Sequence, residues 1–281
     1  MPKREDIILV ECPRDAIQGI SRFIPTEKKV KYLNMLLQSE LFDWLDCGSF
    51  VSPKAVPQLV DTEEVLEQLY PSNKTKLLAI VANEQGASRA VKSENLTYLG
   101  YPFSISEVFQ QRNTNASIAD SFERLKGIVE MAMSHQKEMV VYISMAFGNP
   151  FGDDWSNELV LDWMGKIAAL GVVEFSFADT TSEASLPQIT QLFEQAILQF
   201  PALNIGAHFH SPKWSSLEKI NAAYLAGCRK FDGAILGFGG CPFAEDELVG
   251  NIPTEDLLGY FEGKYEDKIL TLSSEFIKII S

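Results

Sequence analysis

The chain has 281 residues, 46% of them hydrophobic, and its 38 acidic and 24 basic residues give a net charge of −14. Such a charge disfavours nucleic acid or an anionic membrane as a partner. No apolar run approaches the roughly 18 residues of a membrane span, and the four cysteines form no CxxC pair. The first apolar run begins at Ile7, so we expect no signal peptide. We therefore expect a cytoplasmic protein with reduced thiols.

Short apolar runs rich in β-branched and aromatic residues alternate with amphipathic stretches. In chain order the eight runs are 7–12, 42–50, 76–83, 95–103, 138–147, 172–180, 204–210 and 230–238, and the clearest helical patterns are 26–40, 117–136 and 157–171. Apolar strands that alternate with helices indicate a parallel sheet covered by helices, and eight such units in about 240 residues match a (β/α)8 barrel. We predict one TIM-barrel domain over residues 1–281, with a mobile loop after the eighth strand.

The weakest part of this prediction is the stretch 84–94, which contains only a short helical pattern. A doubly wound open sheet is the alternative, but no GxGxxG motif follows the first strand. The residues 253–263 are expected to form a helix on the outside of the barrel. In a barrel of this kind, catalytic residues lie at the carboxyl ends of the strands.

The seventh run ends in "AHFH", which contains two of the three histidines. On a strand, His208 and His210 project to the same face, and two imidazoles on one face form half of a divalent-metal site. A hydrogen-bonded pair of histidines without a metal is the alternative.

The first run leads into "ECPRDAIQ". Asp15 is a candidate third ligand in a mixed nitrogen and oxygen site for Mg²⁺, Mn²⁺ or Zn²⁺. Arg14 is a candidate for stabilising an oxyanion or enolate. The simpler interpretation is an exposed ion pair between Arg14 and Asp15.

Two further carboxylates end apolar runs, Asp46 in the second and Asp179 in the sixth. A carboxylate in such a place is costly unless it is paired or lies in a working site. Asp179 is also a candidate helix N-cap.

The most unusual segment is "GFGGCPFAEDELVGN", residues 237–251, which follows the eighth strand. Its glycines allow a loop that closes over a substrate, and Cys241 would then present a thiol able to give or take a proton. Asn251 offers an amide oxygen that suits a hard cation.

With these motifs in place, the sequence resembles the 3-hydroxy-3-methylglutaryl-CoA lyases, within a wider group of metal-dependent barrels that includes isopropylmalate and homocitrate synthases. The resemblance runs from "PRDAIQ" (13–18) to "GNIPTEDL" (250–257). Its most specific parts are the cysteine loop and "SFVSPKAVPQ" (49–58), whereas "AHFH" is shared with the wider group.

The resemblance implies a role for each candidate. Arg14 would steady the enolate of the departing acetyl-CoA, Cys241 would transfer a proton, and Asp46 and Asp179 would stand at active-site carboxylate positions. The residues that would bind the divalent cation, Mg²⁺ or Mn²⁺, are Asp15, His208, His210 and Asn251. The reaction would be the retro-Claisen cleavage of a 3-hydroxyacyl-CoA to acetyl-CoA and acetoacetate, as in leucine degradation and ketone body formation, without a redox cofactor. The resemblance also implies a homodimer.

Several positions depart from the family pattern. The glutamate expected three residues before the proline is Val10, and a glutamate stands one residue later, at Glu11. Asp46 replaces a longer glutamate, Asn149 stands where a cysteine is usual, and "SPKWSS" (211–216) follows the histidines. These changes leave the metal and thiol positions intact, so the type of reaction is better supported than the exact acyl-CoA.

Two rival functions stay open. One is an acyl-CoA and 2-oxo acid synthase on the same barrel, against which the cysteine loop and the lack of a long C-terminal regulatory region argue. The other is a non-catalytic barrel that binds metal or CoA. Lys54 and Arg112 are candidates for holding the CoA phosphates, because both lie on loops predicted at the open end of the barrel.

Overall fold

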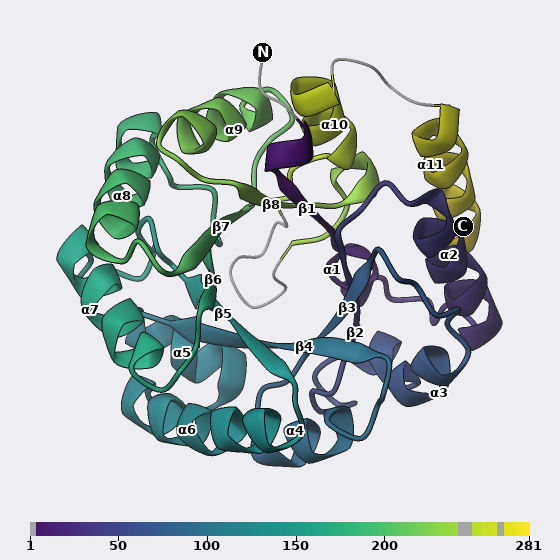
Figure 1. Ribbon diagram of the computed structural model, residues 1–281, viewed down its shortest axis with the longest axis horizontal. Helices are drawn as coiled ribbons and strands as arrows, with labels where there is room; N and C mark the ends of the chain where they lie inside the picture. Colours follow the sequence, from purple (N-terminus) through teal and green to yellow (C-terminus); the bar gives the residue numbers. More distant parts are fainter. Residues whose placement is uncertain (1–3, 241–248, 263–266) are drawn as a thin grey trace.

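The computed structural model describes residues 4–240, 249–262 and 267–281. Within these residues, eight parallel strands pair in chain order and the last pairs with the first, so the sheet closes into a barrel surrounded by helices (Figure 1). The predicted (β/α)8 barrel is confirmed. The strands are β1 (Ile8–Glu11), β2 (Trp44–Ser49), β3 (Lys76–Ile80), β4 (Leu96–Ser104), β5 (Glu138–Ser144), β6 (Glu174–Asp179), β7 (Asn204–Phe209) and β8 (Lys230–Gly233).

Helices connect the strands and cover the outside of the barrel (Figure 1). Those of the described part are α1 (Pro13–Gln18), α2 (Thr26–Ser39), α3 (Thr62–Glu67), α4 (Glu84–Ala90), α5 (Glu107–Thr114), α6 (Ile118–Ser134), α7 (Asn157–Ala168), α8 (Leu186–Gln199), α9 (Ser216–Leu225), α10 (Thr254–Glu262) and α11 (Asp267–Ile280). Short 3-10 turns are η1 (Arg4–Asp6), η2 (Pro57–Leu59) and η3 (Ile235–Gly237). None of the helices in the described ranges is both long and apolar enough to cross a membrane.

The eighth strand is shorter than its apolar run, because β8 ends at Gly233 and the chain turns into η3. Leu236 in this turn has a φ of 60°, a left-handed backbone conformation that is rare for a branched residue. The stretch 84–94 contains the short helix α4, as expected, and Asn83 caps it by accepting a hydrogen bond from Gly86 N at 2.8 Å.

Side chains from alternate strands close the amino-terminal end of the barrel. The rings of Trp44 and Tyr98 stack with centroids 4.0 Å apart. Lys230 lies over the Trp44 ring, 4.8 Å from its centroid, and forms a buried ion pair of 2.7 Å with Glu174. The interior is therefore filled at this end, and space for a substrate is left at the carboxyl ends of the strands.

Aromatic packing outside the sheet fixes which way the histidines of β7 face. Phe209 lies between them in sequence and packs on Phe147 and Phe193, with ring centroids 5.6 and 6.3 Å away. Successive side chains of a strand point to opposite faces, so this outward Phe209 places His208 and His210 on the inner face. A slip of one residue would exchange the two faces, and burial of the phenylalanines opposes that slip.

Candidate active site

The candidate metal ligands come together at the carboxyl end of the barrel from segments far apart in the chain. Asp15 lies in α1, which follows β1 directly, His208 lies in β7, and His210 comes directly after the end of β7. One potential ligand atom from each of the three lies within 4.8 Å of the others, and all three residues are buried. The predicted shared face of the two histidines is thus confirmed, and the carboxylate expected beside them is present.

The electrostatics of this cluster favour a bound cation. Burial raises the pKa of Asp15, but Arg14 and both histidines outweigh burial and lower it to about 2, so the group is a carboxylate at neutral pH. Burial and the neighbouring His208 lower the pKa of His210 to about 4, so His210 is a neutral imidazole. Its buried Nδ1 has no hydrogen-bond partner among the described residues. A carboxylate oxygen and imidazole nitrogens are a donor set that suits Mg²⁺, Mn²⁺ or Zn²⁺.

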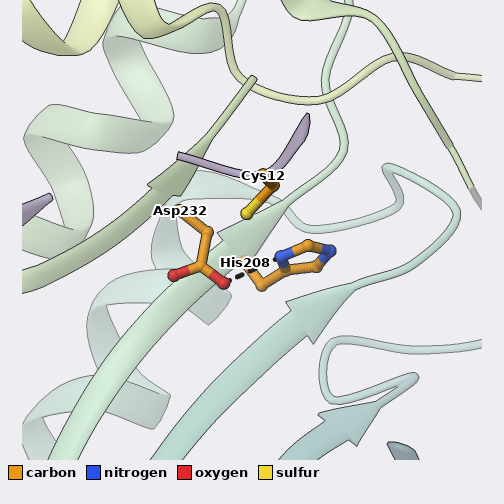
Figure 2. Close-up of side chains that lie close together, drawn as sticks. All are labelled: Cys12, His208 and Asp232. Carbon is orange, nitrogen blue, oxygen red and sulfur yellow. Dashed lines mark hydrogen bonds and ion pairs between the residues drawn. The ribbon is translucent and has the colours of Figure 1, made fainter. Parts of the chain in front are cut away.

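Asp232, on β8, orients His208, and sequence reasoning missed it. His208 Nδ1 and Asp232 Oδ2 are hydrogen-bonded at 2.9 Å, with the thiol of Cys12 beside them (Figure 2). Burial lowers the pKa of His208, but Asp232 outweighs it and the net shift is upward. A carboxylate that holds one ring nitrogen of a histidine presents the other nitrogen to a metal. A buried aspartate inside the apolar run "KFDGAILGF" was the available signal.

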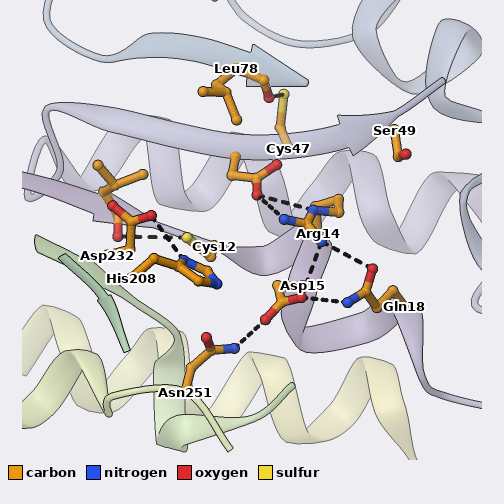
Figure 3. A network of polar contacts seen from close by, with 12 residues as sticks. Cys12, Arg14, Asp15, Gln18, Cys47, Ser49, Leu78, His208, Asp232 and Asn251 are labelled. Carbon is orange, nitrogen blue, oxygen red and sulfur yellow. Dashed lines mark hydrogen bonds and ion pairs between the residues drawn. The ribbon is translucent and has the colours of Figure 1, made fainter. Parts of the chain in front are cut away.

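Arg14 bridges two carboxylates at the edge of the cluster (Figure 3). Its Nη2 and Nε donate to Asp46 Oδ2 at 2.6 and 3.0 Å, and its Nη1 donates to Asp15 Oδ1 and Gln18 Oε1, each at 3.0 Å. The guanidinium is therefore held on several sides and is not part of a simple exposed pair. Its side chain is 11% exposed, and it lines the cavity described below.

Asp46 contacts Arg14 and is fully buried. Burial raises the pKa of Asp46 to about 6 although the charge of Arg14 opposes this. The second oxygen, Oδ1, has no hydrogen-bond partner within the part of the chain that the structure describes. A pKa near neutrality and a free oxygen are properties of a group that can exchange a proton.

Asn251, a candidate cation ligand, lies against Asp15 (Figure 3). Its Nδ2 donates to Asp15 Oδ2 at 2.5 Å and to Phe238 O at 2.9 Å, and the residue forms a β-bridge with His210. Gly239 passes so close that a Cβ there would lie 2.4 Å from Asn251 Nδ2, and its φ is +114°. This position in the glycine-rich segment thus requires glycine. Cys241 lies outside the described residues.

A cavity of about 360 Å³ opens beside the cluster. Arg14, Asp15 and both histidines line one part of it. Apolar side chains line another part, and Arg112 contributes a guanidinium that also lies 4.6 Å from the centre of the Phe151 ring. Lys54 is exposed.

The structure does not bring Asp179 to the metal cluster. The described lining of the cavity includes Ala178 and Thr180, on either side of Asp179, but not Asp179 itself. Its Oδ2 accepts a 2.6 Å hydrogen bond from Lys219, a buried lysine of α9 that also donates to His210 O at 3.2 Å. Alternation along β6 explains the correction, because Asp179 shares the outward face with Phe177.

Replacing Lys219 with methionine is expected to lower the free energy of unfolding by about 3–5 kcal/mol, because it leaves Asp179 buried without a countercharge. The double variant Lys219→Met/Asp179→Asn should recover part of this loss, as measured by urea denaturation. Lys166→Met, which breaks the exposed pair with Asp162, should cost less than about 1 kcal/mol. A double variant no more stable than Lys219→Met alone would contradict the account.

The fold and this site define the class of protein: a closed (β/α)8 barrel with a carboxylate and imidazole cluster at the end where such barrels do their chemistry. The family model described as HMGL-like matches residues 7–273. The chain belongs to the HMGL-like family.

Characterised relatives match over most of their length. A 3-hydroxy-3-isohexenylglutaryl-CoA/hydroxy-methylglutaryl-CoA lyase of Pseudomonas aeruginosa is 32% identical, over 94% of this chain and 86% of the relative. The hydroxymethylglutaryl-CoA lyase of Pseudomonas mevalonii is also 32% identical, with 89% and 82% covered. An HMG-CoA lyase structure from Acinetobacter baumannii, in complex with coenzyme A and 3-methylmalate, superposes with a TM-score of 0.91 at 30% identity, covering 100% of this chain and 93% of the other.

Proposed function

We propose that this protein is a carbon–carbon lyase that cleaves 3-hydroxy-3-methylglutaryl-CoA to acetyl-CoA and acetoacetate with the help of Mg²⁺ or Mn²⁺. The observation that carries the proposal is the cluster of Asp15, His208 and His210 beside Arg14 in one cavity. Membership of the HMGL-like family, and relatives named as hydroxymethylglutaryl-CoA lyases, support the same reaction.

Each residue of the site would have a distinct role in binding the cation or in the reaction. Asp15, His208 and His210 would hold the divalent cation, and Asn251 would join them if its amide oxygen turned toward the ion. The bound cation would supply positive charge that makes the C3 hydroxyl of the substrate easier to deprotonate.

Arg14 would donate hydrogen bonds to the enolate oxygen as the bond between C2 and C3 breaks. Its two carboxylate partners hold it in place before the substrate arrives, so little reorganisation is needed. Asp46 would exchange a proton through its free Oδ1, and Cys241, outside the described residues, would be the thiol that takes part in proton transfer. Arg112 and Lys54 are proposed to meet the CoA phosphates. We also propose a cytoplasmic homodimer.

The direct test is turnover of 3-hydroxy-3-methylglutaryl-CoA. Purified protein with Mg²⁺ or Mn²⁺ and a reducing agent is expected to release acetoacetate, and excess EDTA should stop the release because the Asp15 cluster loses its cation. Adding the metal back in excess should restore turnover. Acetoacetate that forms equally well with EDTA would contradict the metal-dependent reaction.

A larger substrate is the second candidate, and the lining of the cavity favours testing it. One wall of the cavity is apolar and is formed by Val51, Val56, Ile80 and Phe109. A C3 methyl group is too small to cover this wall, whereas a larger apolar substituent could contact more of it. The Pseudomonas aeruginosa relative is named for a 3-hydroxy-3-isohexenylglutaryl-CoA substrate as well. If the isohexenyl ester is cleaved with a higher kcat/KM than the methyl ester, the larger substrate is preferred.

A further inference from the structure

The glutamate that departs from the family pattern, Glu11, ends β1 with its side chain almost completely buried. It points to the outside of the barrel, because Val10 before it packs in the inner cluster and Leu9 packs in the outer core. A carboxyl group in such a place is costly unless hydrogen bonds satisfy it. The hydrogen-bond partners of the Glu11 carboxyl group therefore indicate its role.

Glu11 joins the two ends of the segment between β8 and α10. We call residues 234–238 the departing end and residues 251–254 the returning end. Its Oε1 accepts a hydrogen bond of 2.9 Å from Ile235 N at the start of η3, and its Oε2 accepts one from Thr254 Oγ1 at the start of α10. Two backbone hydrogen bonds link the same ends: Ala234 N donates to Ile252 O at 3.0 Å and Thr254 N donates to Ala234 O at 3.1 Å.

These ends support one side of the candidate metal centre. Asn251 lies within the returning end, and its Nδ2 contacts both Asp15 Oδ2 and Phe238 O, which belongs to the departing end. The relative position of the two ends therefore sets where the Asn251 amide meets Asp15. Glu255 fixes the departing end from the other side, since its carboxylate accepts from Leu236 N at 2.9 Å and from Ser273 Oγ at 2.8 Å.

We propose that Glu11 is a positioning residue for the metal centre, which holds Asn251 against Asp15 by clamping both ends of the segment after β8. The inference rests on the proposed metal role of Asp15 and Asn251. Burial raises the pKa of Glu11 to about 8 although its two hydrogen bonds oppose this, so the group is largely neutral at pH 7. Glutamine, which is neutral and of similar shape, is therefore a close substitute.

The experiment compares Mn²⁺ affinity, measured by electron paramagnetic resonance, in the wild type, Glu11→Leu and Glu11→Gln. Leucine removes both hydrogen bonds, and we expect Mn²⁺ to bind about tenfold or more weakly, within the range for partners that orient metal ligands. Glutamine can still accept from Ile235 N and donate to Thr254 Oγ1, so its affinity should stay near that of the wild type. Ile128→Ala, a buried substitution in α6 across the barrel, controls for general destabilisation (Figure 1).

Each outcome decides between the proposals. Equal Mn²⁺ affinity in folded Glu11→Leu and Glu11→Gln would overturn the positioning role, as would an equal loss in Ile128→Ala. If Glu11→Leu does not fold, Thr254→Val removes one of the two contacts, and wild-type affinity in that variant would also overturn it. Wild-type protein that does not bind Mn²⁺ would instead refute the metal site under the proposed function.

Discussion

Replacing Asp15 with asparagine is expected to weaken Mn²⁺ binding by about a hundredfold or more and to reduce turnover in parallel. Asp15 supplies the negative charge of the cluster it forms with His208 and His210, and its pKa of about 2 keeps it ionised. Substitutions of residues that merely orient metal ligands already cost roughly 10–100-fold in affinity. Asparagine keeps the shape of the side chain and removes its charge, so the loss would report electrostatics and not packing.

Isothermal titration of Mn²⁺ into both proteins measures this effect. Asp162→Asn is the matched control, because Asp162 is an exposed aspartate of α7 that pairs only with Lys166 in the described structure. Wild-type Mn²⁺ affinity in folded Asp15→Asn would show that the cation, if any, binds elsewhere.

Arg14→Met is expected to lower kcat by about 10²–10³-fold, the usual cost of removing one donor to a developing oxyanion. Mn²⁺ affinity should be unchanged or higher, because Asp15 loses a competing cation that lies 3.0 Å away. The two measurements together separate the role of Arg14 from that of the metal ligands, which should lose both properties.

Arg14→Lys is the informative companion variant. Lysine keeps the charge but lacks the planar fork that reaches Asp46 and Asp15 at once, so its kcat should fall between those of the wild type and the methionine variant. A kcat for Arg14→Met within threefold of the wild type would mean that Arg14 only balances the two carboxylates.

The architecture could be predicted from local patterns. Each strand of the barrel is an apolar run, because both of its faces are buried, and each run is followed by a helix or a turn. The positions of Arg14, Asp15, His208 and His210 followed from the same argument, since parallel strands place their carboxyl ends at one end of the barrel. Alternation along β7 then sufficed to put both histidines on one face.

The partners of these residues could not be predicted, because they depend on which side chains meet across the closed sheet. Asp232 is 24 residues from His208 in sequence and meets it only because β7 and β8 are neighbours. Asp179 looked like an active-site carboxylate at the end of its strand. Its side chain faces outward instead, where the packing of α9 places Lys219 beside it.

The partners of Glu11 could not be predicted either, and they are even farther away in the sequence. Its hydrogen-bond partners, Ile235 and Thr254, lie more than 220 residues away. They reach it only when the barrel closes and β1 pairs with β8. The chain alone thus specifies the elements, their order and the residues at their ends, because hydrophobic periodicity is local. Closure of the barrel decides which polar groups become buried together, since each of them must then find a partner among side chains that sequence distance does not relate.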